Sequence, residues 1–333
     1  MISLCECDCE TVEKTAEQYG VILPIEQTES WRKYQDTVPG RSAWKNLIIE
    51  DDGKPAGSVS FIKHSTHGYY FLRSAHGPVW FDSPDQTTEK SRIQALAKYV
   101  KENDKSIVFL RSAFSFDSDI SCRVLSTVPY DTTVVIDLTG GDEQIISRMK
   151  KRGRRDVRKA LRDCPAVITD DTKQVIGGSF DEYYEIMAET GNRDGFVPAP
   201  KSDYKNMIEC LGYEHCRVFG ARINGKLCAW SIITINKTHA VRYYAAMRTE
   251  AMRSYITDRL TFAECSELSK LGVQSFDLMG IGSDFAPSLN GLNTFKTKFS
   301  QETRSVVPER DIPIKKMFYS TLKTMKKIKN LKH

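Results

Sequence analysis

The sequence lacks any long uninterrupted run of apolar residues, and no stretch approaches the roughly eighteen that a membrane-spanning helix requires. Its N-terminus, MISLCECDCE, carries acidic residues where a secretory signal has a basic stretch followed by an apolar one, so export is not expected. Hydrophobic residues make up 40% and charged residues 27% of the 333 residues, which excludes a disordered chain and a fibre. At about 150 residues per domain, we expect two globular domains in the cytoplasm.

Metal sites and several common catalytic motifs are also missing. The sequence contains no P-loop, no HExxH metal site and no GxSxG nucleophile elbow, and its six histidines show no paired spacing. The nine cysteines, an odd number, do not form a secreted disulfide framework. Cys5, Cys7 and Cys9 could bind zinc, but no Cys/His pair at zinc spacing follows them. An edge strand with unreactive thiols is the preferred interpretation, and we expect no metal and no cofactor.

The positive charge is concentrated in two segments. Residues 315–333 contain seven lysines and no acidic residue, and the rest of the chain has 41 Lys and Arg against 43 Asp and Glu. A second basic run comprises Arg148, Lys150, Lys151, Arg152, Arg154, Arg155, Arg158, Lys159 and Arg162. Two basic clusters on a nearly neutral body predict anionic partners, such as phosphates, nucleic acid or a membrane surface.

A weak internal repeat indicates two similar domains. Residues 47–61 and 219–233 each read as a strand, a polar-Gly-Lys turn and a second strand, and Asp-Gly or Asn-Gly between apolar runs favours a hairpin. The same order of strand, helix and strand then follows each hairpin, at 69–72, 91–100 and 107–110 and again at 241–244, 263–272 and 276–279. The repeat predicts two α/β domains that join near residues 138–147.

The last segment of the chain is predicted to be an amphipathic helix. From Pro313 onward, one helical face collects Phe318, Leu322, Met325, Ile328 and Leu331, with lysines elsewhere. One interpretation is a terminal helix that docks through this apolar face. The other is a basic helix that also contacts anionic lipid, and the two are compatible.

Two segments combine cations with aromatic residues. Residues 190–200, TGNRDGFVPAP, are expected to form a loop in which Arg193 could grip a phosphate or carboxylate bidentately. Residues 290–300, NGLNTFKTKFS, follow a Gly-rich stretch and carry Lys296 next to Phe295. A lysine between aromatic rings could stabilise an oxyanion, although an isolated lysine is more often a surface residue.

Read in order, these segments resemble the FemABX family of peptidoglycan bridge-forming aminoacyltransferases. The resemblance extends over nearly the whole chain, and the motifs that carry it are Gln27-x-x-x-Trp31, GPV at 77–79, TVVIDL at 133–138, KKRGRRDVRKA at 150–160, NRDGF at 192–196, YYAAM at 243–247, FDLMGI at 276–281 and GLNTFKTKF at 291–299. Residues 110–114, LRSAF, depart from the Asp-Pro pair that the family commonly has there. Residues 201–219 contain no helical-arm insertion, so the chain resembles the compact, armless type.

The resemblance implies an α+β or α/β fold of two tandem GNAT-like domains with mixed sheets. We expect the first domain at 1–141, the second at 142–305, and a basic helix at 306–333 that packs back on the first domain. The implied activity is transfer of an amino acid from aminoacyl-tRNA to a stem-peptide amine of a lipid-linked or UDP-linked peptidoglycan precursor. The enzyme would be cytoplasmic, with its C-terminal helix at the inner face of the membrane.

The resemblance also implies roles for individual residues. Lys296 would stabilise the oxyanion and Phe295 would shape the pocket. Arg193 and Lys33 would bind the phosphates of the precursor. Tyr243 and Tyr244 would line the acceptor site. The tRNA is assigned the basic helix, with Arg152, Arg154, Arg155 and Arg158, a use that the charge of this segment also favours.

Two alternatives remain open. The first is a GNAT-type N-acyltransferase that uses acyl-CoA or another activated acyl donor. Residues 247–260, MRTEAMRSYITDRL, contain no glycine, so the backbone cradle that such enzymes use for pyrophosphate is not evident. The second is a non-enzymatic tRNA- or membrane-binding protein on a decayed transferase fold, against which the retained Phe295-Lys296 pair argues.

Overall fold

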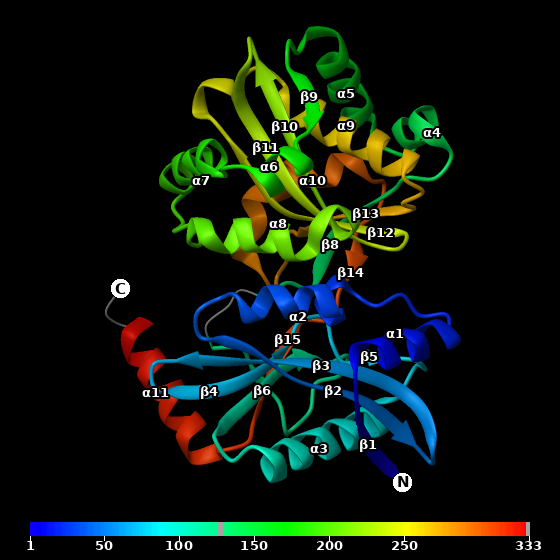
Figure 1. The fold of residues 1–333 in the computed structure, drawn as a ribbon, viewed down its shortest axis with the longest axis vertical. Coiled ribbons are helices and arrows are strands. Elements are labelled where there is room, and N and C mark those ends of the chain that lie inside the picture. Colours follow the sequence, from blue (N-terminus) through cyan, green and yellow to red (C-terminus); the bar gives the residue numbers. More distant parts are fainter. Residues whose placement is uncertain (126–128, 331–333) are drawn as a thin grey trace. The chain divides into compact units, whose positions relative to one another are not determined.

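The computed structural model describes residues 1–125 and 129–330, and the chain divides into two compact units. Unit 1 comprises Met1–Tyr130 and Val307–His333, and unit 2 comprises Asp131–Val306. Each unit contains one mixed β-sheet with helices packed on it (Figure 1). In the described part of the chain, no helix has both the length and the apolar character needed to cross a membrane.

Unit 1 is built on an eight-stranded sheet with the order β1-β2-β3-β4-β6-β15-β7, in which β5 pairs with β3. Its strands are β1 (Ile2–Cys7), β2 (Arg41–Asp51), β3 (Lys54–Thr66), β4 (Tyr69–Ser74), β5 (Val79–Trp80), β6 (Ile107–Ala113), β7 (Cys122–Arg123) and β15 (Glu309–Pro313). Its helices are α1 (Cys9–Gln18), the short 3₁₀ helix η1 (Ile25–Gln27), α2 (Glu29–Asp36), α3 (Gln86–Asn103) and α11 (Lys316–Asn330).

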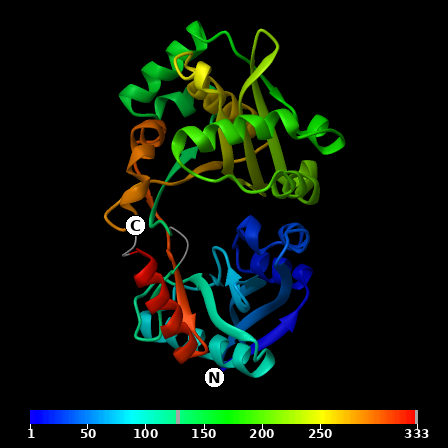
Figure 2. The ribbon, with the colours of Figure 1, turned by 90° about the vertical axis from the view of Figure 1, so that its left-hand side faces the viewer.

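Side-chain alternation along β4 and β6 assigns helices to opposite faces of this sheet. Leu72 and Leu110 belong to a buried cluster with Ile93 and Leu96 of α3. Their neighbours Phe71 and Phe109 instead pack with Tyr319 of α11. Figure 2 shows α11, in red, beside the strands of unit 1. The segment after Val306 therefore completes the core of unit 1, as expected for a C-terminal helix that packs back on the first domain.

The docked face of α11 differs from the predicted one. Tyr319 is 2% exposed and its hydroxyl donates to Asp311, and Leu322 packs beside it. Met325 and Ile328, which were expected on the docked face, are 62% and 50% exposed. The predicted docked face is therefore confirmed at Leu322 and wrong at Met325 and Ile328, and the contact of Tyr319 with a buried carboxylate accounts for the rotation of the helix. Leu331 and Lys332 lie outside the described residues.

Unit 2 is built on a seven-stranded sheet with the order β14-β8-β13-β12-β11-β10-β9. Its strands are β8 (Thr132–Asp137), β9 (Val167–Asp170), β10 (Cys216–Ile223), β11 (Lys226–Asn236), β12 (His239–Met247), β13 (Ser275–Gly280) and β14 (Arg304–Ser305). Its helices are α4 (Gly141–Ser147), α5 (Lys151–Asp163), α6 (Thr172–Gly177), α7 (Asp181–Asp194), α8 (Lys201–His215), η2 (Thr249–Ala251), α9 (Ile256–Lys270), η3 (Pro287–Leu292), α10 (Asn293–Lys296) and η4 (Thr297–Phe299).

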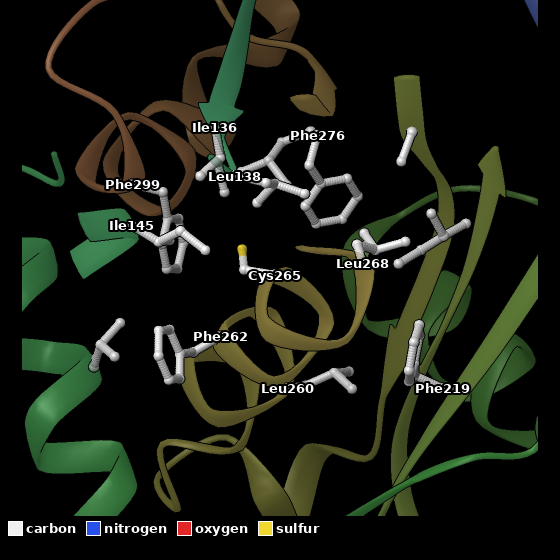
Figure 3. Packing of buried hydrophobic residues seen from close by; sticks show 14 of the residues in the cluster. Ile136, Leu138, Ile145, Phe219, Leu260, Phe262, Cys265, Leu268, Phe276 and Phe299 are labelled. Atoms are coloured by element: carbon white, nitrogen blue, oxygen red, sulfur yellow. The ribbon is translucent and has the colours of Figure 1, made fainter. Parts of the chain in front are cut away.

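Two separate packing layers cover the sheet of unit 2. On one face, α9 contributes Leu260, Phe262, Cys265 and Leu268 to a buried cluster that Phe299 also joins (Figure 3). This cluster further includes residues of β8, α4 and α5. On the other face, aromatic side chains of α7, α8 and β11 pack together, and they are Tyr183, Tyr204 and Trp230 with Phe180.

The predicted repeat is present in both sheets. The turns at Asp52-Gly53 and Asn224-Gly225 all have positive φ, between 48° and 80°, as the tight hairpin turn requires. After each hairpin, a strand pairs in parallel with the strand that follows the next helix, β4 with β6 and β12 with β13. The division between units falls at Asp131, earlier than the predicted boundary at 141/142, because β8 pairs with β13 and β14 of the second sheet.

Candidate active site

The parallel pair β12–β13 separates after three residue pairs, from His239↔Ser275 to Val241↔Asp277. Beyond this point β13 also has an irregular register with β8, between Asp277 and Gly280. Met279 has a φ of 62°, a left-handed conformation that non-glycine residues rarely adopt. The carboxyl-terminal ends of these two strands bind two of the candidate residues of unit 2, Lys296 at the end of β13 and Arg193 at the end of β12.

Lys296 is held at the end of β13. Its ammonium donates to the carbonyl oxygens of Met279 and Gly280, at 3.2 Å and 2.9 Å, so the irregular end of the strand provides both acceptors. Two hydrogen bonds between Asn293 and Gly282 fix α10 nearby. The N–H of Gly282 donates to the side-chain oxygen of Asn293 at 2.7 Å, and the side-chain NH₂ of Asn293 donates to the carbonyl of Gly282 at 3.0 Å. An ammonium has three N–H donors. Among the described residues two of them bond to the carbonyls of Met279 and Gly280, so the third can bind a substrate oxygen.

The electrostatic surroundings of Lys296 weaken its proton affinity. Burial lowers its pKa to about 8 from the usual 10.5, and the nearby charge of Arg242 acts in the same direction. The carboxylate of Asp277 opposes this shift. At neutral pH the side chain is therefore mainly an ammonium that is poorly solvated, a state in which it interacts strongly with a developing negative charge.

Phe295 packs away from open solvent. Its ring lies against the buried cluster of unit 2 and meets Phe299 edge to face, with ring centroids 5.3 Å apart. The ammonium of Lys298 lies 5.1 Å from the Phe295 ring. Phe295 thus anchors α10 to the core, which fixes the backbone that carries Lys296.

A bulge in β12 determines where the two candidate tyrosines lie. Ile232 pairs with Tyr244 and Ile233 with Arg242, which leaves Tyr243 as the extra residue. Arg242 therefore contacts Glu264 of α9, whereas Tyr244 packs on Tyr204 of α8 with ring centroids 4.7 Å apart. The bulge separates the cation and the tyrosine onto opposite faces, and the sequence gives no sign of it.

Arg193 lies in the last turn of α7 and not in a loop, so the predicted loop begins only after Asp194. Its guanidinium donates to both carboxylate oxygens of Asp194, at 2.7 Å and 2.9 Å, and to the carbonyl of Met247 at 2.8 Å. The bidentate grip expected for a phosphate is thus satisfied by Asp194. A bound phosphate would have to replace that half-exposed carboxylate, while the bond to Met247 would keep Arg193 at the end of β12.

Lys33 belongs to unit 1, where it is exposed on α2 and lies 4.0 Å from Glu29. The same unit contains the cysteine cluster. Cys5 and Cys7 lie on the edge strand β1, Cys9 begins α1, and burial raises the pKa of the Cys9 thiol to about 12. No group of three or more metal-binding side chains occurs in residues 1–125 and 129–330.

The basic segment forms α5, and its cations do not share one environment. Lys151, Arg155, Arg158 and Arg162 are exposed at helical spacing, and we call these four residues the cationic stripe. Arg152 is exposed beside the stripe. Arg154 is half-buried and donates to the carbonyls of Met149 and Ser147, so it caps the end of α4. Arg154 was assigned to tRNA together with Arg152, Arg155 and Arg158, and its guanidinium is here directed toward the end of α4.

The buried face of α5 packs directly on the segment that carries Lys296. A Cβ atom on Gly153 would lie 2.1 Å from the carbonyl oxygen of Lys298, so only glycine permits this approach. The backbone N–H of Lys150 donates to the same carbonyl at 3.1 Å. Lys298 was missed in the sequence, although the second lysine of FKTKF and the single glycine of the basic helix are the signals that could have indicated it.

The comparisons with known proteins agree with this arrangement. Residues 224–327, which contain β12, β13 and the Lys296 segment, match the model of the FemAB family. Over this part of its length the chain is similar to the FemAB family. No curated protein matches it. The family and the fold together indicate an acyltransferase.

Solved structures show the same fold at low sequence identity. A crystal structure of FemX matches this chain with a TM-score of 0.74 and 14% identity, covering 96% of this chain and 99% of that one. The C-terminal domain of a putative lysylphosphatidylglycerol synthetase from Agrobacterium fabrum matches with a TM-score of 0.55, 13% identity and 92% coverage of both chains. A tandem GNAT protein from the clavulanic acid pathway matches with a TM-score of 0.54, 11% identity and coverages of 94% and 99%. The tandem GNAT-like fold is thereby confirmed.

Proposed function

We propose that this protein transfers an aminoacyl group from aminoacyl-tRNA to an amine of the stem peptide of a lipid-linked or UDP-linked peptidoglycan precursor. The observation that carries the proposal is the ammonium of Lys296, which is held on two carbonyls at the open end of β12–β13. Two residues after Lys296, the carbonyl of Lys298 packs on Gly153 of α5. The face of α5 opposite Gly153 carries the cationic stripe. This arrangement supports a site for a polyanionic donor close to an oxyanion-stabilising group in unit 2.

The chemistry is aminolysis of an ester. The lone pair of a neutral amine attacks the ester carbonyl, a carbon–nitrogen bond forms, and negative charge develops on the carbonyl oxygen. Lys296 donates its remaining N–H to that oxygen. The oxyanion then collapses, the carbon–oxygen bond to the tRNA 3′-terminal ribose breaks, and the ribose oxygen takes up the proton that the amine loses.

The remaining assignments accompany this proposal. Phe295 holds the Lys296 segment on the core and shapes the pocket. Arg193 and Lys33 bind phosphates of the precursor, and Tyr243 and Tyr244 line the site of its amine. No metal or cofactor is part of the proposal.

The loop after β12 argues against the acyl-CoA alternative. An acyl-CoA pyrophosphate would need backbone N–H groups that point toward it. The amides of Ala251, Met252 and Ser254 donate to carbonyls within the loop, and the amide of Thr249 donates to the carboxylate of Glu189 at 2.6 Å. An acidic side chain on the first amide disfavours a pyrophosphate there.

The direct test is transfer of radiolabelled amino acids from total bacterial aminoacyl-tRNA to either precursor by the purified protein. Label on a precursor supports the proposal and identifies the amino acid and the acceptor. Absence of transfer to both precursors, with acetyl-CoA-dependent acylation of an amine in its place, would instead support the acyl-CoA reading.

We expect the cationic stripe to dominate tRNA affinity. Replacing Arg155 and Arg158 with glutamine should reduce the slope of log affinity against log salt by about 1.5, because each phosphate contact contributes about 0.7–0.9. Filter binding between low and physiological salt measures the slope. The matched control replaces Lys226 and Lys270, exposed lysines elsewhere in unit 2, with glutamine. If both double substitutions reduce the slope equally, tRNA responds to the overall positive charge of the protein and not to a binding surface on α5.

We expect α11 to contact anionic membranes through its exposed apolar residues. Met317, Phe318, Met325 and Ile328 are exposed, and lysines of the same helix flank them. Replacing Met325 and Ile328 with glutamate should reduce cosedimentation with vesicles containing phosphatidylglycerol by about tenfold without changing the melting temperature. The corresponding exchange at Thr321 and Thr324 is the charge control. Unchanged cosedimentation would contradict membrane contact through this face.

A further inference from the structure

The ammonium of Lys298 is the best-enclosed cation near the candidate site. Lys298 is 7% exposed, and its ammonium forms ion pairs with Asp258 of α9 and, at 3.4 Å, with Asp156 of α5. The rings of Phe295 and Phe299 lie 5.1 Å and 5.3 Å from it. A buried charge that loses its ion-pair partners is strongly destabilising. The ion pairs of Lys298 therefore hold α5, α9 and η4 together.

The backbone around Lys298 binds the same helix. The carbonyl of Lys298 accepts the N–H of Lys150 and abuts Gly153. The side-chain amide of Gln301 donates to the carbonyl of Met149 at 2.7 Å. Side-chain and main-chain contacts thus fix the Lys296 segment against the start of α5.

Asp156 connects this buried contact to the exposed face of α5. Its carboxylate accepts from Arg155 at 2.9 Å and lies 3.5 Å from Arg152 as well as 3.4 Å from Lys298. Phosphates that bind Arg152 and Arg155 would compete with Asp156 for these arginines. Asp156 would then interact mainly with Lys298, which tightens the contact when a polyanion is bound.

We infer that Lys298 is a positioning residue, which through Asp156 holds Lys296 in register with the cationic helix that binds the donor RNA. This inference rests on the proposed function for the identity of the donor. It requires no contact between Lys298 and substrate. Its physical content is that α5 and the Lys296 segment move as one body, so an aminoacyl ester delivered along α5 meets the ammonium at a fixed place.

The decisive measurement is the pH at which Lys296 becomes reactive toward a limiting amount of acetic anhydride, quantified by mass spectrometry. In the native protein we expect a midpoint near the pKa of about 8. In Lys298→Met and Asp156→Asn the midpoint should rise toward the ordinary value of 10.5, because the loosened segment lets Lys296 reach water. Asp163→Asn is the matched control, since Asp163 lies on the same helix and pairs only with Arg162 among its described ion pairs.

A kinetic readout accompanies the labelling. Asp156→Asn should lower kcat by about 10–100-fold without raising KM for aminoacyl-tRNA, because the loss is in alignment and not in binding. Lys298→Arg, which can bridge the same carboxylates, should restore most of the turnover. If Lys298→Met does not fold, Asp156→Asn decides the question.

The outcomes separate the two proposals. A midpoint that stays near that of the native protein in folded Asp156→Asn would overturn the positioning role, whatever the transfer activity. A midpoint that moves equally in Asp163→Asn would also overturn it, because the effect would then be the charge of the helix. Absence of transfer by the native protein would overturn the proposed function, while the labelling midpoints would still decide the role of Lys298.

Discussion

Replacing Lys296 with methionine is expected to lower the turnover of aminoacyl transfer by about 10²–10³-fold, the usual cost of removing one oxyanion donor. The affinity for tRNA should stay within about twofold, because the cationic stripe on α5 is unchanged. The thioether retains the packing of the lysine stem but donates no hydrogen bond. Single-turnover transfer and filter binding measure the two quantities, and Lys298→Met must be compared separately because it acts on position.

The contribution of Lys296 to turnover is expected to decrease as the pH rises. Lys296 is protonated below its pKa of about 8 and loses its proton as the pH rises through that value. The oxyanion term should therefore fade above pH 8, while deprotonation of the acceptor amine increases the rate. The turnover of the native protein should pass through a maximum and fall.

Lys296→Arg separates these two effects. A guanidinium stays charged throughout the accessible range, so the falling limb should disappear even if the overall rate is lower. Spontaneous hydrolysis of aminoacyl-tRNA, measured without enzyme at each pH, is subtracted. A falling limb shared by the native protein and Lys296→Arg would show that Lys296 is not the group that titrates.

The repeated α/β pattern could be predicted from sequence because its signals are local. The Asp-Gly and Asn-Gly turns determine the two hairpins, and the β-branched run at 132–136 indicates a strand. Which sheet that strand joins is a matter of long-range pairing. β8 pairs with β13, more than a hundred residues later, so the boundary between units could not be located from the segment itself.

The site was predicted in part for a similar reason. Helical spacing alone gives the exposed stripe of α5, but the capture of Arg154 by the end of α4 depends on tertiary packing. The bulge at Tyr243 follows from how β11 and β12 pair, and no residue type at that position signals it. Arg193 was recognised as a cation suited to a bidentate grip, whereas its present partner, the adjacent Asp194, follows from the last turn of α7.

The buried pair Arg242–Glu264 leads to the second large prediction. Glu264 is fully buried, accepts from the hydroxyl of Ser231 at 2.5 Å, and pairs with Arg242, which also donates to Thr261. Arg242→Met would leave this carboxylate without its cation. We expect unit 2 to lose about 3–5 kcal/mol of unfolding free energy at pH 8, the cost of an uncompensated buried charge.

The loss should be smaller at pH 5. Burial already raises the pKa of Glu264 above 4.5, and removal of Arg242 would raise it further. A carboxyl whose folded pKa lies above its unfolded value is best tolerated at low pH, and the stability falls as the pH rises through the folded value. At pH 5 the variant can bury a neutral carboxyl in place of a carboxylate.

Urea unfolding at the two pH values tests this, with the emission of Trp230 as the probe of unit 2. The background replaces Trp31, Trp44 and Trp80 of unit 1 with phenylalanine, so that Trp230 alone reports. Arg242→Met combined with Glu264→Met should recover most of the loss, because two apolar side chains fill the space without a charge. Equal losses at pH 5 and pH 8, or a double variant no more stable than Arg242→Met, would mean that packing around Phe276 and not the ion pair holds α9 on β12.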